Sequence, residues 1–128
     1  MQFEDDYYRL LGRCGDETNG AFRIALLSGC GIYRGHFPGH PVCPGVCNMQ
    51  VIKECAERMT GKRLHIGYIR RCRLTAVATP AVCSVLEVKI SLQPTETGYR
   101  ITATLADAQR TYMEYKGDLA AYGEGGLA

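Results

Sequence analysis

The sequence lacks several features that would place it in a class at once. It has no uninterrupted apolar run approaching about eighteen residues, so no membrane-spanning helix is expected. Its 15 Lys and Arg nearly balance its 13 Asp and Glu, which argues against a general nucleic-acid binder. The acidic start, residues 1–6, has neither the basic nor the apolar part of a signal peptide. We therefore expect a cytoplasmic protein that folds as a single domain over residues 1–128, with a loose tail from about residue 121.

Disulfide signatures are also scarce. The seven cysteines include no C-x-x-C pair. An odd number of cysteines, in a chain with no expected signal peptide, favours a reducing compartment over a disulfide scaffold. Most of them are predicted to be small buried hydrophobic residues, for example Cys55, Cys72 and Cys83.

Proline and glycine divide the first half of the chain. Residues 3–14 fit either a short helix or an irregular entry, and the pattern does not decide between them. Residues 22–27 are predicted to form a strand. Three prolines between residues 38 and 44 exclude a helix or a central strand from the loop that follows. A helix is then predicted to begin near Gly45 and to stop at Gly61.

This predicted helix is apolar over most of its circumference. At about 100° per residue, its apolar side chains cover an arc of roughly 200°. They are Cys47, Met49, Val51, Ile52, Cys55, Ala56 and Met59. The polar sector holds Gln50, Lys53, Glu54 and Glu57, and Asn48 alone interrupts the apolar arc. The helix is therefore predicted to be central to the fold.

The second half of the chain is rich in alternating segments. Leu64, Ile66 and Tyr68 are predicted to share one face of the first of these. The predicted strands are 64–77, 82–92, 99–105 and 113–119. Short turns between successive strands indicate an antiparallel meander. One helix after a first strand, followed by three or four antiparallel strands, predicts an α+β domain in which the sheet wraps around the helix.

The loop before the helix carries a specific motif. It reads Gly35-His36-Phe37-Pro38-Gly39-His40-Pro41-Val42-Cys43-Pro44-Gly45-Val46. This segment resembles the signature of the 3-hydroxyacyl-acyl carrier protein dehydratases of fatty-acid synthesis. That family has the hot-dog fold, in which a curled antiparallel sheet wraps a long central helix, and the element order matches from about residue 20 to residue 120. The resemblance implies dehydration of a 3-hydroxyacyl thioester to a trans-2-enoyl thioester, with no metal or organic cofactor.

The resemblance also implies catalytic roles. His36 is implied as the base that removes the proton alpha to the thioester, and the Gly45 N–H as the donor to the thioester carbonyl. An imidazole titrates near neutral pH, and a helix N-terminus is a ready donor to a developing enolate. The family's second catalytic group is a carboxyl five residues after this glycine, where this chain has Gln50. Because an amide has no acidic proton, Gln50 is expected to orient the hydroxyl or a water, with Glu54, one turn later, as the alternative acid.

Substrate contacts and partners follow from the same resemblance. Phe37, Val46 and Glu54 are expected to contact the substrate beside Gly45. The acyl group is expected to be carried by acyl carrier protein or by coenzyme A. The family implies a homodimer with each active site between two subunits, and many members assemble into hexamers.

A basic stretch follows the helix and reads Arg70-Arg71-Cys72-Arg73. These arginines are expected either to dock an acidic acyl carrier protein or to face solvent as an ordinary basic strand. Family members usually continue from such a strand into a P-G-D turn, whereas this chain reads Thr79-Pro80-Ala81. The difference indicates a branch other than the main housekeeping dehydratases.

Two other functions and one other site remain open. A hot-dog thioesterase would use the helix residue to position water, and a non-catalytic acyl-thioester binder would have no need of the acid that Gln50 replaces. His36, His40, Cys43 and Cys47 have donor types and spacing that would suit zinc. The intervening prolines restrict how this loop could enclose an ion, so no metal is predicted.

Overall fold

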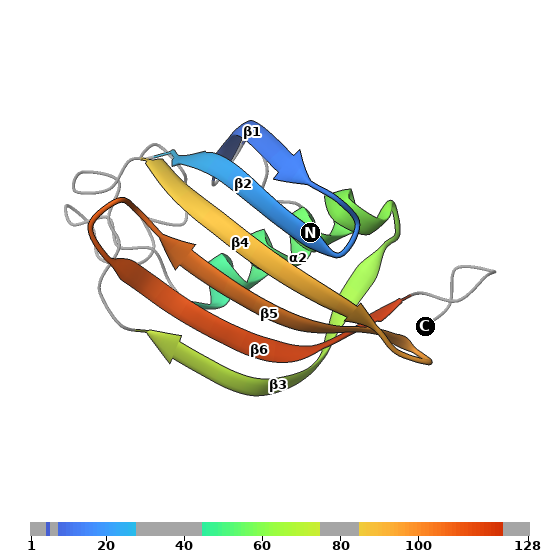
Figure 1. Ribbon diagram of the computed structural model, residues 1–128. Coiled ribbons are helices and arrows are strands. Elements are labelled where there is room, and N and C mark those ends of the chain that lie inside the picture. Colours follow the sequence, from blue (N-terminus) through green and yellow to red (C-terminus); the bar gives the residue numbers. More distant parts are fainter. Residues whose placement is uncertain (1–4, 6–7, 28–44, 75–84, 122–128) are drawn as a thin grey trace.

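The computed structural model describes residues 5, 8–27, 45–74 and 85–121, with the backbone alone described at 45–47. Within these residues the chain forms one helix and a six-stranded antiparallel sheet (Figure 1). In chain order the elements are β1 (Tyr8–Gly15), β2 (Asn19–Leu26), α2 (Gly45–Thr60), β3 (Leu64–Leu74), β4 (Val85–Pro94), β5 (Gly98–Ala106) and β6 (Thr111–Ala121). Within the described parts of the chain, no helix is both long and apolar enough to cross a membrane.

The strand order is β1-β2-β4-β5-β6-β3. The strands β2 and β3 are consecutive in the chain, but β2 lies near one edge of the sheet and β3 forms the other edge. The helix α2 lies between them in the sequence, and the chain therefore crosses the inner face of the sheet as it passes from β2 to β3. The sheet curls around this helix (Figure 1), which contacts β3, β4 and β6. This arrangement confirms the predicted α+β architecture.

The core fills the space between α2 and the inner face of the sheet. Along β4, Leu86, Val88, Ile90 and Leu92 are buried, while the residues between them are exposed, as the alternation predicts. The helix contributes Val51, Ile52, Cys55, Ala56 and Met59 to the same core. Burial of these five positions confirms that the helix is central.

The helix ends where the sequence predicts. The Gly61 N–H donates to the Glu57 carbonyl oxygen at 2.9 Å, and Gly61 has a φ of 68°. This left-handed conformation suits glycine and closes the helix.

The first strand corrects the sequence prediction. Residues 3–14 are expected to form a short helix or an irregular entry, but within the described part of this segment Tyr8–Gly15 form the edge strand β1, paired with β2. The register shifts between Leu10 and Gly12. This irregularity interrupts the alternation of side chains that normally identifies a strand in a sequence.

A second correction concerns β3. Tyr68 does not share a face with Leu64 and Ile66, because the register shifts between Ile66 and Tyr68 and leaves Tyr68 62% exposed. Cys72 is exposed rather than buried, since β3 is an edge strand, whereas Cys55 is buried as predicted.

Candidate functional site

The candidate site lies on α2, where a polar pair interrupts an otherwise buried helix. Gln50 is half-buried, and Glu54 lies one turn later on the same face, as the spacing predicts. The Gln50 Nε2 donates to the Glu54 Oε2 at 2.8 Å. The structure therefore brings together the two helix residues that the sequence singled out.

Glu54 is more buried than its place in the predicted polar sector suggested. Its side chain is 3% exposed, and the Tyr8 hydroxyl donates to its Oε1 at 3.0 Å. The helical wheel contains no information about Tyr8, at the start of β1, which reaches this carboxyl group from another part of the chain. Each oxygen of the Glu54 carboxylate thus accepts one hydrogen bond from a different element.

These hydrogen bonds make the burial of Glu54 tolerable. Taking a carboxylate out of water is costly unless donors replace the water. Hydrogen bonds to an ionised group contribute about 1.5–3 kcal/mol each, more than those between neutral groups. Tyr8 and Gln50 both donate, so the two hydrogen bonds offset part of the cost of burying the Glu54 carboxyl group.

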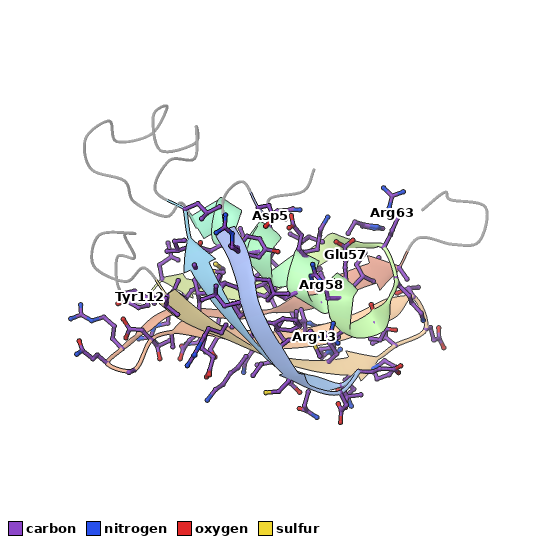
Figure 2. All side chains as sticks on the ribbon, turned by 90° about the horizontal axis from the view of Figure 1, so that it is seen from above. Asp5, Arg13, Glu57, Arg58, Arg63 and Tyr112 are labelled. Atoms are coloured by element: carbon purple, nitrogen blue, oxygen red, sulfur yellow. The ribbon has the colours of Figure 1, made fainter. Side chains whose placement is uncertain are left out.

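Sequence reasoning missed Tyr8. It is 1% exposed, and a buried tyrosine usually finds a partner for its hydroxyl. A second hydrogen bond also joins β1 to α2: Arg13 Nη1 donates to the Arg58 carbonyl oxygen at 3.2 Å. Figure 2 shows Arg13 and Arg58 close together near the end of the helix. The strand is therefore fixed to the helix at two places, and Tyr8 is held over Glu54.

The remaining predicted site residues are described to different extents. His36 and Phe37 lie outside the described residues. Gly45 and Val46 are described by their backbone alone, as the first two residues of α2.

The zinc alternative falls largely outside the described chain. His36, His40 and Cys43 are not among the described residues, nor is the side chain of Cys47. Among the described residues, no group of three or more His, Cys, Asp or Glu side chains could hold a metal ion.

The start of α2 has the electrostatic character expected of an anion or oxyanion site. Its first turn contains no acidic residue, so no carboxylate of its own offsets the positive end of the helix dipole there. A helix start also leaves backbone N–H groups without partners inside the helix. This combination can stabilise negative charge that develops on a substrate oxygen.

The predicted docking arginines lie on β3 and are exposed. Arg70 forms an ion pair with Asp118, with 3.2 Å between Nη2 and Oδ2. Arg71 lies opposite Lys116 in the β3–β6 register, and Arg73 lies opposite Glu114. Figure 1 shows that β3 ends at the same end of the molecule as the start of α2.

Solved structures with the same architecture define the class of fold. One is the dehydratase heterocomplex ApeI:P from Xenorhabdus doucetiae, with a TM-score of 0.75 and 19% identity, covering 88% of this chain and 96% of that one. Another is a hypothetical thioesterase with coenzyme A from Streptococcus pneumoniae, with a TM-score of 0.65 and 7% identity, covering 91% of this chain and 86% of that one. The protein has a hot-dog fold, as the motif resemblance implied.

The family follows from sequence similarity. A family model described as ApeI-like, ApeI dehydratase, matches residues 13–114. The chain belongs to this dehydratase family. It is also 29% identical over 94 residues to a 3-hydroxyacyl-acyl carrier protein dehydratase FabZ of Lactiplantibacillus plantarum, and 26% identical over 92 residues to a FabZ of Fusobacterium nucleatum. These matches span 65% and 63% of this chain, and 64% and 65% of the two relatives.

Proposed function

We propose that this protein dehydrates a 3-hydroxyacyl thioester, carried by acyl carrier protein or coenzyme A, to a trans-2-enoyl thioester. The observation that carries the proposal is membership of a dehydratase family over residues 13–114. The motif loop and the helix that follows it, the segment with the strongest resemblance, fall within that match.

In the proposed reaction one base moves one proton. His36 removes a proton from the carbon alpha to the thioester, and the carbonyl oxygen gains negative charge that the Gly45 N–H at the helix start stabilises. The electron pair then forms the C2–C3 double bond as the C3–O bond breaks. The protonated imidazole returns the proton to the departing hydroxyl group, which leaves as water.

Gln50 has a hydrogen-bonding role in this proposal. Its amide cannot act as the acid that a carboxyl provides at this position in the family. General acid catalysis is worth typically about 10²–10⁴-fold, so a slow enzyme is expected unless His36 carries out both proton transfers efficiently. The contact between Gln50 and Glu54 supports a fixed orientation of the amide.

A homodimer is part of the proposal, and β3 supports it. Ile69 and Leu74 lie opposite Gly117 and Met113, residues that face the core, yet they are 42% and 59% exposed. An edge strand whose apolar side chains are exposed is suited to pairing with a second copy. Sedimentation equilibrium of the purified protein tests this: a monomer at micromolar concentration contradicts it.

Docking of an acyl carrier protein is proposed for the arginines of β3. Arg71 lies opposite Lys116, where two positive charges reinforce each other, whereas Arg70 is already paired with Asp118. We expect Arg71→Glu to lower kcat/KM for the carrier-bound substrate and to leave that for the short pantetheine thioester unchanged. Equal losses with both substrates would contradict docking at this position.

Hydration of a trans-2-enoyl-acyl carrier protein, the reverse reaction, tests the proposed activity. The wild type is compared with His36→Ala and Gln50→Glu. Activity in the wild type that His36→Ala abolishes supports a dehydratase that works without the family's acid. If neither the wild type nor Gln50→Glu hydrates the substrate, the proposed dehydratase activity is contradicted. Release of the free acid would instead indicate a thioesterase.

A second candidate is a non-catalytic binder of acyl thioesters. The observation that favours it is the amide of Gln50 in the place of an acid. Activity that appears in Gln50→Glu but not in the wild type would support this binder, since the site would then be intact apart from the acid.

A further inference from the structure

Glu54 is an acidic side chain buried against the helix α2 and the strand β1. It is 3% exposed, and both of its oxygens are engaged, Oε1 by the Tyr8 hydroxyl at 3.0 Å and Oε2 by the Gln50 amide at 2.8 Å. Tyr8 belongs to β1 and Gln50 to α2, so the carboxylate joins two elements. A buried carboxylate held in this way has little freedom to move.

The contact fixes which way the Gln50 amide faces. An amide has a donating NH2 end and an accepting carbonyl end, and the two are similar in shape. In the structure the NH2 end faces Glu54, because Nε2 donates to Oε2 at 2.8 Å. The carbonyl oxygen of Gln50 therefore lies on the side away from Glu54. A carbonyl oxygen has two lone pairs, so it can accept a ligand hydroxyl group in addition to one other donor.

We propose that Glu54 is a positioning residue that, with Tyr8 holding it, turns Gln50 into a hydrogen-bond acceptor and so selects thioesters with a hydroxyl group at C3. The inference rests on the proposed function in one respect, that position 50 faces C3 of the acyl group. A 3-hydroxyl group donates to the Gln50 oxygen, whereas a 3-oxo group has no proton to donate. The carboxylic acid of other family members would donate at this position, and this chain accepts instead.

Binding of two stable ligands tests the inference. The probes are the 3-hydroxyoctanoyl and 3-oxooctanoyl amides of pantetheine, in which nitrogen replaces the thioester sulfur, and their Kd values are measured by titration calorimetry. We expect the wild type to bind the 3-hydroxy ligand about fivefold to tenfold more tightly, which corresponds to one net hydrogen bond.

Two substitutions alter the hydrogen bonds around Gln50 with little change in side-chain shape. Glu54→Gln replaces the carboxylate with an amide, which can pair with Gln50 in either orientation, so the preference should fall to about twofold or less. Tyr8→Phe removes only the hydroxyl that holds Glu54, and the preference should fall to an intermediate value. If Glu54→Gln fails to fold, Tyr8→Phe decides the question.

Matched controls carry the same changes elsewhere in the chain. Glu57→Gln alters a carboxylate on the same helix whose Oε2 accepts from the Leu64 N–H at 2.9 Å. Tyr112→Phe removes the hydroxyl of a buried tyrosine that donates to Asp107 at 2.5 Å. Glu57 and Tyr112 lie toward opposite ends of the molecule (Figure 2). Both controls should retain the wild-type preference.

The outcomes separate the inference from the proposed function. If Glu54 serves packing alone, Glu54→Gln weakens both ligands equally and keeps their ratio, and this result overturns the inference while the function stands. Equal binding of the two ligands by the wild type overturns it as well. Binding of neither ligand contradicts the proposed function, and the inference falls with it.

Discussion

Substituting Gln50 by Glu places a second carboxylate against Glu54. The Gln50 Nε2 lies 2.8 Å from the Glu54 Oε2, and this contact requires that one partner donate. Two ionised carboxylates can only accept, so the hydrogen bond is lost and the charges repel. If the side chains relax to about 4 Å, the repulsion is about 4 kcal/mol at an effective dielectric constant of about 20. Adjacent carboxylates avoid most of this cost by sharing one proton.

The pH dependence of stability follows from that proton. In Gln50→Glu the folded state binds a proton that the unfolded state releases more readily, so its stability is present at low pH and is lost as pH rises. We expect the free energy of unfolding, relative to wild type, to fall by about 2–4 kcal/mol between about pH 5 and pH 9. Urea unfolding followed by circular dichroism at several pH values measures it.

The double variant Gln50→Glu/Glu54→Gln is the control. It restores one carboxylate facing one amide, with the two exchanged, so its stability should follow the wild type across the same pH range. A single variant that follows the wild type at every pH would refute the reasoning, because the two residues would then not be in contact. A double variant as pH-sensitive as the single one would refute it too.

Three further predictions concern stability, measured as urea midpoints. Tyr8→Phe should cost about 1–3 kcal/mol, because a buried carboxylate loses a donor, and a loss below about 0.5 kcal/mol would contradict that hydrogen bond. A Cβ at Gly98 would lie 2.0 Å from the Leu119 backbone oxygen, so Gly98→Ala should cost at least about 2 kcal/mol, whereas Gly12→Ala, with nothing within 4 Å of the new Cβ, should not. A tyrosine hydroxyl and two backbone N–H groups lower the pKa of Asp107 from its ordinary 3.8, so its contribution should be present above that pH and lost below it, and Asp107→Asn should remove this acid dependence.

The parts of the fold that were predictable are those in which local pattern and global burial agree. In β4 the side chains alternate strictly between core and solvent, so the period of two marks the strand and its inner face together. The end of α2 is equally local, because Gly61 takes the left-handed conformation that favours glycine. Neither inference needs knowledge of a distant residue.

The errors arise where pairing between strands overrides the local pattern. The register shift between Leu10 and Gly12 hides β1, and the one between Ile66 and Tyr68 turns Tyr68 outward. A bulge adds a residue to one strand only, so it depends on the partner strand and leaves little trace in the sequence of the bulged one. The exposure of Cys72 is non-local in the same way, since it follows from the position of β3 at the edge of the sheet.

At the candidate site, the environment of Glu54 depends on both its position on the helix and a distant residue. A helical wheel places it in the polar sector with Lys53 and Glu57, yet it is 3% exposed and accepts a hydrogen bond from Tyr8, 46 residues earlier in the chain. Considered alone, Gln50 implies that the site has lost its carboxyl. Considered with the contact at 2.8 Å, the carboxyl is present one turn later and faces the amide rather than replacing it. The hydrogen bonding at position 50 therefore depends on both residues, and a helical wheel alone does not reveal the contact with Tyr8 that completes it.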